Sequence, residues 1–336
     1  MRRASAVLLA VFALGSAGAA DVKVGGYFSL DFHLGQAASP APHGSIENIQ
    51  SGLLFSGTWS ERLGYALEIR SREGMRFEME QAWVGLLWSE AAQVKLGLFL
   101  VPFGRLNTSG RPFETPFVQT PLPVAAAFPA SWRELGVLAE GKTGSFRYAA
   151  YVGNGLAEGQ DLSSGQQFRD NNKNKAWGGR LGLLLGSSFE AGGSYHSGKV
   201  SDDDGRLLTM KGADVLWSDR GIRLAAEYCR SDIANPAPFA AGKAEGYYLL
   251  GSFDLGGVSP VVGFQKFAYE DAFHGEGFAG PLVPGLGISE NRRVWSIGLT
   301  AALAADVILK AEYAFNREAD ADRKNDIFRA QVAARF

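Results

Sequence analysis

The sequence predicts an all-β protein, a transmembrane antiparallel β-barrel of about 16 strands with an inward-folded third loop. The first observation is a period of two between apolar and polar residues, kept over stretches of about nine residues, which is long enough to cross a bilayer at a tilt. The second is that short and long connections alternate along the chain. The third is the end of the chain, where Phe328 and Phe336 fall on one face and Arg329 and Arg335 on the other. An apolar outer face, a polar inner face and a final aromatic residue are typical of the closing strand of an outer-membrane barrel.

The first twenty residues predict an export signal. Met1 is followed by two arginines, residues 7–14 are apolar, and residues 15–20 are small, as expected before a cleavage site. The apolar run is too short for a membrane-spanning helix. We therefore expect a signal peptide over residues 1–20 and one barrel domain over residues 21–336.

Composition narrows the class of protein further. The chain has 336 residues, 43 glycines and a net charge of −2, and its mean hydropathy is −0.04. The lone Cys229 excludes a disulfide within the chain, and the four histidines show no metal-ligand spacing, so we expect no metal and no cofactor. The sequence has no basic stretch interleaved with aromatic residues, so we expect no nucleic-acid partner.

Individual strands can be placed from the alternation. The first runs from about Val22 to Leu34, with Val22 and Phe28 outward and Tyr27 and Asp31 inward. The segment that ends the chain is the last of about sixteen, an even number, as single-chain bacterial barrels require. The strands between them centre on Leu53, Leu67, Val84, Leu98, Val137, Tyr148, Leu183, Ala191, Met210, Leu224, Leu249, Phe264, Ile297 and Leu309.

The connections provide an independent indication, because such barrels join short periplasmic turns with longer external loops. Short connections are expected at residues 59–62, 89–93, 141–145, 186–188, 218–220, 255–257 and 304–306. Longer polar or Gly/Pro-rich connections are expected at residues 35–46, 71–77, 101–132, 154–175, 198–206, 231–244, 270–291 and 316–325.

The long connection over residues 101–132 is unusually apolar. It carries Phe103, Phe113, Phe117 and Phe128 among several prolines. Such a segment is poorly suited to extend into water, so we expect it to fold into the barrel, pack against the inner wall and narrow the lumen.

Part of this region resembles a known family. VKLGLFLVPFGRLN at residues 94–107, followed by Pro121 and by WRELGV at residues 132–137, is similar to a motif region of the phosphate-selective porin O/P family. The resemblance covers about 45 residues closely. It implies a passive channel in the outer membrane of a Gram-negative-type bacterium, surrounded by lipid and assembled as a homotrimer. The chain departs from the family's ladders of Arg and Lys, since the loop region offers only Arg105, Arg111 and Arg133.

Charged residues that the alternation turns inward are the candidate functional residues. Because charge sets ion preference in a narrow pore, an excess of basic residues predicts a preference for anions. The family resemblance implies passive diffusion of small hydrophilic solutes or ions, with phosphate-like anions among the candidates. The alternative is that these are ordinary water-facing charges paired with nearby acids, namely Asp31, Glu68, Glu140, Glu190, Glu227 and Glu312. The predicted pore constriction consists of Arg105, Arg111, Glu114, Arg133 and Glu134, and the predicted lumen wall of Lys23, Arg62, Arg70, Lys95, Arg147, Arg180, Arg223, Lys310 and Arg329.

Other functions receive less support. Residues 136–143 match the phosphate-cradling pattern G-x4-G-K-[ST], but that loop needs a following helix, and an alternating strand follows here. A barrel enclosing an electron-transfer partner such as a multihaem cytochrome would need a wide lumen without an inward loop. An outer-membrane hydrolase would need a serine and a histidine on one wall, and no motif singles one out among His33, His43, His196 and His274. We expect no enzyme activity.

Overall fold

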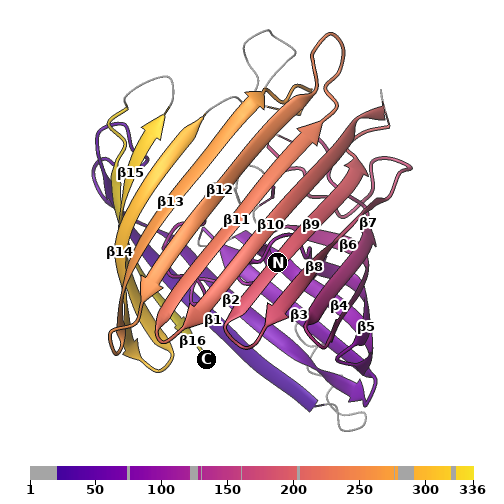
Figure 1. Cartoon of the computed structure of the whole chain (residues 1–336), viewed down its shortest axis with the longest axis horizontal. Helices are drawn as coiled ribbons and strands as arrows, with labels where there is room; N and C mark the ends of the chain where they lie inside the picture. The colour runs from indigo at the N-terminus through magenta and orange to yellow at the C-terminus, as the bar shows by residue number, and fades with distance from the viewer. Residues whose placement is uncertain are drawn as a thin grey trace, which may run out of the picture.

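The computed structural model shows a closed antiparallel barrel whose strands tilt across the molecule (Figure 1). It describes residues 21–73, 76–121, 128–129, 131–159, 161–202, 205–275, 277–278, 291–318 and 323–336. None of the helices in these residues is long and apolar enough to span a bilayer. The strands are β1 (Asp21–Gly35), β2 (Ser45–Ser60), β3 (Leu63–Arg72), β4 (Arg76–Ser89), β5 (Ala92–Leu100), β6 (Arg133–Thr143), β7 (Phe146–Gly153), β8 (Ala176–Leu185), β9 (Phe189–Lys199), β10 (Leu207–Asp219), β11 (Ile222–Ile233), β12 (Gly242–Phe253), β13 (Val258–Asp271), β14 (Arg292–Ala304), β15 (Val307–Glu318) and β16 (Ile327–Arg335).

The barrel closes where β1 pairs with β16. Tyr27 lies opposite Arg335, and the pairing continues to Gly35 opposite Ile327. Gly26 and Phe336 exchange two backbone hydrogen bonds, each 3.0 Å long. Since a lipid bilayer offers no hydrogen-bond partners for an open sheet edge, this closure is what allows the sheet to span a membrane. The predicted fold class is confirmed, and each predicted strand centre falls in a separate strand.

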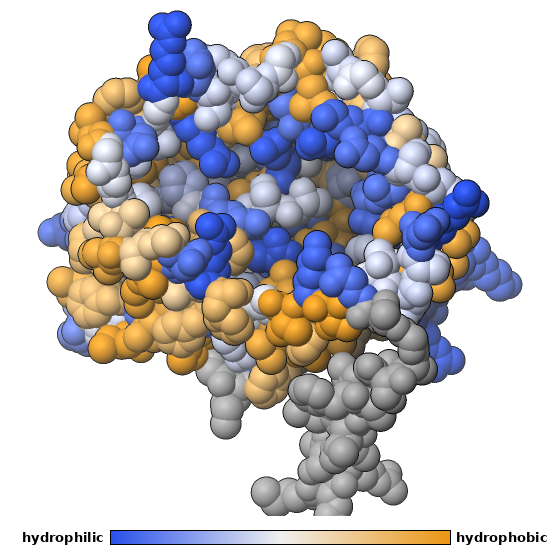
Figure 2. All heavy atoms as spheres, turned by 90° about the horizontal axis from the view of Figure 1, so that it is seen from below, coloured by the Kyte–Doolittle hydropathy of each residue, from blue (hydrophilic) through white to orange (hydrophobic). Residues whose placement is uncertain are grey.

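The predicted inner and outer faces of the first strand are also present. Val22 and Phe28 are exposed on the outer surface, whereas Tyr27 and Asp31 are buried on the inner side. Seen from the side of the short turns, hydrophilic side chains gather in a central hollow and hydrophobic ones cover much of the outer flank (Figure 2). Figure 2 therefore shows the arrangement expected of a barrel with lipid outside and water inside.

One predicted connection is shorter than expected. The region 71–77 was predicted as a long loop, but β3 continues to Arg72 and β4 begins at Arg76, and these two residues are paired in the ladder. The prediction was wrong because the polar residues at this hairpin belong to the strands. Arg72, for example, lies 3.9 Å from Glu78 of the neighbouring strand.

A β-bulge in β4 changes which residues face inward. The register shifts between Glu68 and Ile69, which lie opposite Gln81 and Met79, and so leaves Glu80 as an extra residue. An extra residue in one strand turns two successive side chains to the same face. Glu80 is consequently buried beside Arg70 on the inner side, although simple alternation from Val84 would place it outside.

One buried side chain, that of Asn107, holds together the two ends of the third external loop, residues 101–132. The amide nitrogen of Asn107 donates hydrogen bonds to the carbonyls of Val101 at 2.8 Å and Trp132 at 2.9 Å. The side-chain oxygen of Asn107 accepts the backbone N–H of Trp132 at 2.7 Å. All three bonds are between buried groups, where unpaired polar atoms would be costly. The loop is thus closed at its base by Asn107.

Aromatic residues pack the loop against the inner wall. Phe103 and Phe117 are almost fully buried, and each ring lies over a glycine of the wall. A Cβ atom on Gly212 would lie 3.0 Å from Phe103, and one on Gly263 would lie 2.7 Å from Phe117. The wall therefore has hollows in β10 and β13 that admit these rings. This packing produces the inward-folded loop that the sequence predicts.

Lys310 of β15 fixes the middle of the loop. Its buried ammonium group donates hydrogen bonds to the carbonyls of Pro112 and Phe117, the latter at 3.2 Å, to the Thr115 hydroxyl at 3.2 Å and to the Gln331 amide oxygen at 2.9 Å. The sequence predicts Lys310 as a charge on the lumen wall. The contacts of Lys310 show that it anchors the loop.

We predict that Lys310→Met loosens the loop. The substitution leaves buried loop carbonyls without a donor, which destabilises the docked loop by about 1–3 kcal/mol for each unsatisfied group. Single-channel recordings should show a clear rise in open-channel current noise. Lys211→Met, which removes an exposed lysine of β10, is the control and should leave the noise unchanged. Equal noise in Lys310→Met and the native protein would contradict the anchoring role.

Candidate functional site

The third loop divides the space inside the barrel into two main cavities. One, the turn-side cavity, has a volume of about 560 Å³ and extends to residues beside the short turns, such as Glu90 and Lys142. The other, the loop-side cavity, has a volume of about 170 Å³ and extends to Arg72 and Ser131 near the long loops. Thr108, in the short 3-10 turn η2 (Leu106–Thr108), lines both cavities. A solute that crosses the barrel by way of these cavities therefore passes this turn.

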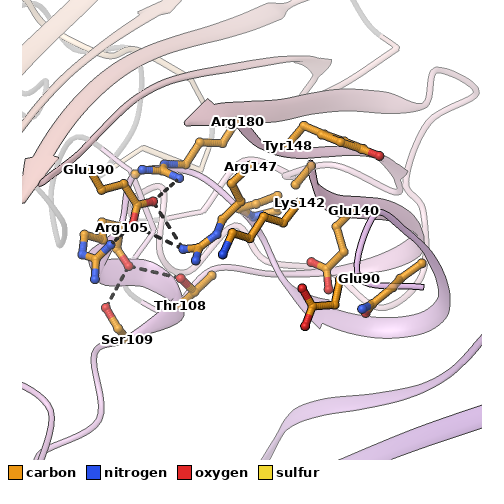
Figure 3. Close-up of a pocket in the computed structure, with 15 residues that line it drawn as sticks. Glu90, Arg105, Thr108, Ser109, Glu140, Lys142, Arg147, Tyr148, Arg180 and Glu190 are labelled. Atoms are coloured by element: carbon orange, nitrogen blue, oxygen red, sulfur yellow. Dashed lines mark hydrogen bonds and ion pairs between the residues drawn. The ribbon is translucent and has the colours of Figure 1, made fainter. Parts of the chain in front are cut away.

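Three arginines converge on one carboxylate in the turn-side cavity (Figure 3). Arg105 of the loop lies 2.6 Å from Glu190 of β9, Arg147 of β7 lies 3.3 Å from it, and Arg180 of β8 lies 3.0 Å from it. Arg180 also pairs with Asp214 of β10 at 2.5 Å. Five elements, the loop and strands β7 to β10, thus form one charged cluster, which we call the Glu190 cluster.

In the Glu190 cluster two of the three arginines, Arg105 and Arg147, lie closer to water than the carboxylate, whereas Arg180 is as buried as Glu190. The side chains of Arg147 and Arg105 are 49% and 26% exposed, whereas that of Glu190 is 8% exposed. Across the loop, Arg111 is 18% exposed, its partner Glu68 1% and its second partner Glu114 28%. The order is therefore clear at the Glu190 cluster, where Glu190 lies behind Arg105 and Arg147.

Glu227 of β11 holds the 3-10 turn in place. One carboxylate oxygen accepts the backbone N–H groups of Arg105 and Leu106, both at 2.6 Å. The preceding Gly104 has a φ of +62° and donates its N–H to the hydroxyl of Ser194 at 3.0 Å. A Cβ at Gly104 would come within 2.7 Å of Glu227, so a glycine is needed for both the conformation and the close approach. These contacts fix the backbone position of Arg105 and therefore the point from which its side chain extends.

The loop-side cavity is lined by a second set of charges. Arg111 forms two hydrogen bonds with Glu68 of β3, at 3.0 and 2.7 Å, and lies 3.3 Å from Glu114. Burial by itself lowers the pKa of Arg111, but the hydrogen bonds and negative charge of Glu68 outweigh it and raise the pKa above its ordinary value. Arg111 therefore carries a permanent positive charge.

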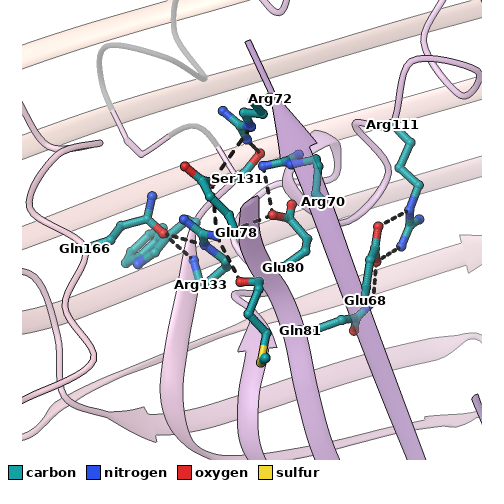
Figure 4. A network of polar contacts seen from close by, with 12 residues as sticks. Glu68, Arg70, Arg72, Glu78, Glu80, Gln81, Arg111, Ser131, Arg133 and Gln166 are labelled. Atoms are coloured by element: carbon teal, nitrogen blue, oxygen red, sulfur yellow. Dashed lines mark hydrogen bonds and ion pairs between the residues drawn. The ribbon is translucent and has the colours of Figure 1, made fainter. Parts of the chain in front are cut away.

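Above this pair, a network of charges covers the external ends of β3, β4 and β6 (Figure 4). Arg133 lies 3.4 Å from Glu78 and 3.6 Å from Glu80, and Arg70 lies 2.8 Å from Glu80. The network locks neighbouring strands together beside the cavity. Arg133 is therefore held against β4, whereas the sequence predicts it beside Arg105 and Arg111.

Two predicted residues lie away from the water-filled space. Glu134, predicted at the constriction, is fully buried and accepts hydrogen bonds from the Trp132 indole at 3.3 Å and the Gly155 backbone N–H at 2.9 Å. It supports the base of the loop. Arg62, predicted on the lumen wall, is exposed in the turn between β2 and β3, because β2 extends to Ser60 and β3 begins only at Leu63.

The remaining predicted wall residues lie on strands. Lys95 pairs with Glu140 at 2.5 Å and lies over the Trp83 ring at 4.4 Å. Arg329 pairs with the buried Glu312 at 3.0 Å. Arg223 lines a small space of about 30 Å³ together with Arg105 and Glu114, and Lys23 is exposed near the start of β1. The structure thus brings Arg147, Arg180 and Arg223 to Arg105, and leaves Lys23, Lys95 and Arg329 apart from that group.

Comparison with known sequences identifies the family. The sequence pattern of the Gram-negative porin family matches this chain over residues 4–333. The chain belongs to the Gram-negative porin family. This porin is also 24% identical over 362 residues to an uncharacterised protein of Aquifex aeolicus (strain VF5), covering 94% of this chain and 80% of that protein.

Solved structures show the same fold. This porin resembles the anion-selective porin from Comamonas acidovorans with a TM-score of 0.65 and 15% identity, covering 94% of this chain and 99% of that one. It resembles in-vitro folded OmpT of Vibrio cholerae, in its trimer form, with a TM-score of 0.64 and 12% identity, covering 95% and 100%. Family and fold are those of an outer-membrane channel.

Several residues of the porin's site are missed by sequence reasoning. Glu78 and Glu80 turn inward because of the bulge, which alternation does not reveal. Lys142 was counted in a short connection but lines the turn-side cavity, and Thr108 carries no charge that would single it out. Glu227 was counted as an inward acid, and its bonds to the loop backbone depend on the fold. In the described residues, no group of three or more potential metal ligands could hold a metal ion.

We predict that Glu227→Ala weakens the position of Arg105, whereas Glu227→Gln largely preserves it. Alanine leaves two backbone N–H groups without an acceptor, at a cost of about 1.5–3 kcal/mol per bond to a charged group. Glutamine keeps a side-chain oxygen in reach of both. Conductance and ion selectivity should therefore change clearly in the alanine variant and only slightly in the glutamine variant. If both variants differed from the native protein to the same extent, the carboxamide would not replace the carboxylate in this role.

Proposed function

We propose that this porin lets small hydrophilic solutes diffuse passively through the outer membrane of a Gram-negative-type bacterium and prefers anions. The observation that carries the anion preference is the order of exposure in the Glu190 cluster. There Arg105 and Arg147 face the cavity and Glu190 lies behind them. Across the loop Arg111 lies between the buried Glu68 and the more exposed Glu114, so the proposal rests on the turn-side cavity.

The mechanism is a steric filter with an electrostatic bias. The loop, held by Asn107, Glu227 and Lys310, limits the cross-section around Thr108. The low-dielectric barrel wall strengthens the field of the exposed arginines, which raises the local concentration of anions. No bond is made or broken, and the solute moves down its own gradient.

Oxyanions such as phosphate suit the Glu190 cluster best among small anions. A guanidinium group presents its N–H donors as a planar fork that matches two oxygen atoms of one anion. Within the cluster, Arg180 binds the two carboxylate oxygens of Asp214 through two nitrogens, at 2.8 and 2.5 Å, so an oxyanion is already bound in this way. The fold shared with an anion-selective porin agrees with this preference.

The alternatives are less well supported. A barrel that encloses an electron-transfer partner requires an open lumen, whereas this loop is packed across the lumen through Phe103 and Phe117. A hydrolase would require a histidine placed to activate a nucleophile. His196, the most buried histidine described, forms a hydrogen bond with Tyr151 at 2.7 Å and packs against Trp132.

We further propose that the exported protein lacks residues 1–20 and forms a homotrimer, as the trimer form of Vibrio cholerae OmpT illustrates for this fold. Native mass spectrometry of protein extracted from the outer membrane tests both statements. The monomer mass should correspond to a chain that begins near Asp21, and the assembly should weigh three times as much. A full-length monomer mass would refute the signal peptide, and a monomeric assembly would refute the trimer.

We predict that Arg105→Ala and Arg147→Ala each lower the anion-to-cation permeability ratio. Each removes an exposed positive charge and leaves Glu190 less well compensated. The measurement is the reversal potential of the refolded protein in a planar bilayer under a salt gradient. It is best made near 0.1 M salt, where charges act over about 10 Å, compared with about 3 Å at 1 M. The ratio should fall by severalfold in the double variant.

Arg62→Ala is the matched control, because it also removes an arginine but from an exposed turn. It should leave the reversal potential unchanged. Glu190→Gln should shift the potential in the opposite direction, towards stronger anion preference. A cation-directed or zero reversal potential in the native protein would refute the anion preference while leaving the passive channel intact.

A further inference from the structure

Arg223 of β11 lies on the inner wall beside the third loop. Its side chain is exposed, and it follows the same inward alternation as Glu227, which holds the loop backbone. Together with Arg105 and Ser109 of the loop, Arg223 lines a space of about 30 Å³. Arg105 and Ser109 also line the turn-side cavity. Arg223 therefore lies at the edge of that cavity.

The small space between Arg223 and the loop is not a route for solutes. A volume of about 30 Å³ corresponds to a single water molecule. The loop is thus closed against β11 and β12 at this point. A solute that has passed Thr108 enters the turn-side cavity instead, and there it comes close to the exposed Arg223.

Arg223 differs from the arginines of the two main cavities because no acidic residue neutralises it. In the described residues it forms no ion pair and no side-chain hydrogen bond. Its partners in the ladder are Ser218 of β10 and Ser252 of β12. Glu114 lines the same small space, but it pairs with Arg111 at 3.3 Å. The arginines that line the two main cavities each pair with an acidic residue, and they are Arg70, Arg72, Arg105, Arg111, Arg147 and Arg180.

This difference decides which N–H donors a solute can use. A guanidinium group presents its donors as a planar fork that fits two oxygen atoms of one anion. The fork of Arg180 already holds Asp214, and that of Arg111 holds Glu68 at 3.0 and 2.7 Å. Arginines paired in this way attract anions chiefly through their charge. The fork of Arg223 has no such partner among the described residues.

We infer that Arg223 binds oxyanions as they cross the pore, beside the hydroxyl groups of Ser218 and Ser252, and so makes the pore favour oxyanions over halides. Two oxygens of a sulfate, phosphate or carboxylate match the fork, and a serine hydroxyl can donate a further hydrogen bond. A spherical halide cannot use the fork in this way. The inference rests on the proposed anion preference and adds to it a selection among anions.

Block of the chloride current by inorganic sulfate tests this site. Sulfate that binds at Arg223 occupies the path of chloride, so it should reduce the single-channel current of the native protein in a planar bilayer. In Arg223→Gln the half-blocking concentration of sulfate should rise roughly tenfold, the change expected when one hydrogen bond between charged groups is lost. Bromide at the same concentration should block neither protein.

Two further variants separate the fork from the charge. Arg223→Lys keeps the positive charge, so it should keep the reversal potential in a chloride gradient. It should still raise the half-blocking concentration of sulfate severalfold, because an ammonium group has no planar fork. Ser252→Glu places a carboxylate directly opposite Arg223, where it can occupy the fork, and should abolish the block.

Arg220→Gln is the matched control. Arg220 belongs to the same β10–β11 hairpin, but its side chain is 92% exposed in the turn. The substitution should leave both the sulfate block and the reversal potential unchanged. If Arg223→Gln forms no channels, Arg223→Lys and Ser252→Glu still test the site.

Three results would each overturn the inference. They are the absence of sulfate block in the native protein, equal block in Arg223→Gln and the native protein, and full block in Arg223→Lys. The proposed anion preference is tested separately, by the reversal potential of the native protein. A zero or cation-directed potential would refute that preference even where the sulfate block depends on Arg223. An anion-directed potential with a block independent of Arg223 would refute the oxyanion site alone.

Discussion

The need to satisfy every backbone hydrogen bond within the bilayer is the constraint on which the whole structure depends. The sheet meets it by pairing β1 with β16, and the closed wall then fixes the position of everything inside. The third loop is stable in the lumen because the wall supplies partners for its backbone. Glu227 accepts two N–H groups, and Lys310 donates to two carbonyls. Charged side chains on the wall are therefore structural partners of the loop as much as they are part of the pore.

The motif that resembles phosphate-selective porins has a structural explanation in this protein. Its asparagine, Asn107, and its tryptophan, Trp132, close the base of the loop, and Glu134 holds the indole from behind. Shared motif residues of this kind preserve the inward fold of the loop and carry little information about the solute. In the function we propose, the solute is instead met by Arg105 and Arg147, which are more exposed than their acidic partner Glu190.

Basic residues on the two faces of the sheet have different surroundings. Inside, arginines that converge on a carboxylate are held by short ion pairs and line a cavity. Outside, Lys266 and Arg293 lie opposite each other, two residues from the paired Phe264 and Trp295. Strand alternation assigns each residue to its face, and only the ladder shows which charges become neighbours.

The sequence by itself determined the architecture. A period of two over nearly every strand and the order of short and long connections are local properties, so they located the described strands. The apolar composition of residues 101–132, also a local property, predicted the inward loop. Tertiary structure decided the site. The bulge at Glu80, the convergence of Arg105, Arg147 and Arg180 on Glu190, and the burial of Glu134 depend on pairing register and on loop packing. These join residues up to 85 positions apart, and no local pattern encodes which distant partner a charged side chain will meet, because the free energy of each pairing depends on the burial and geometry that the closed barrel creates.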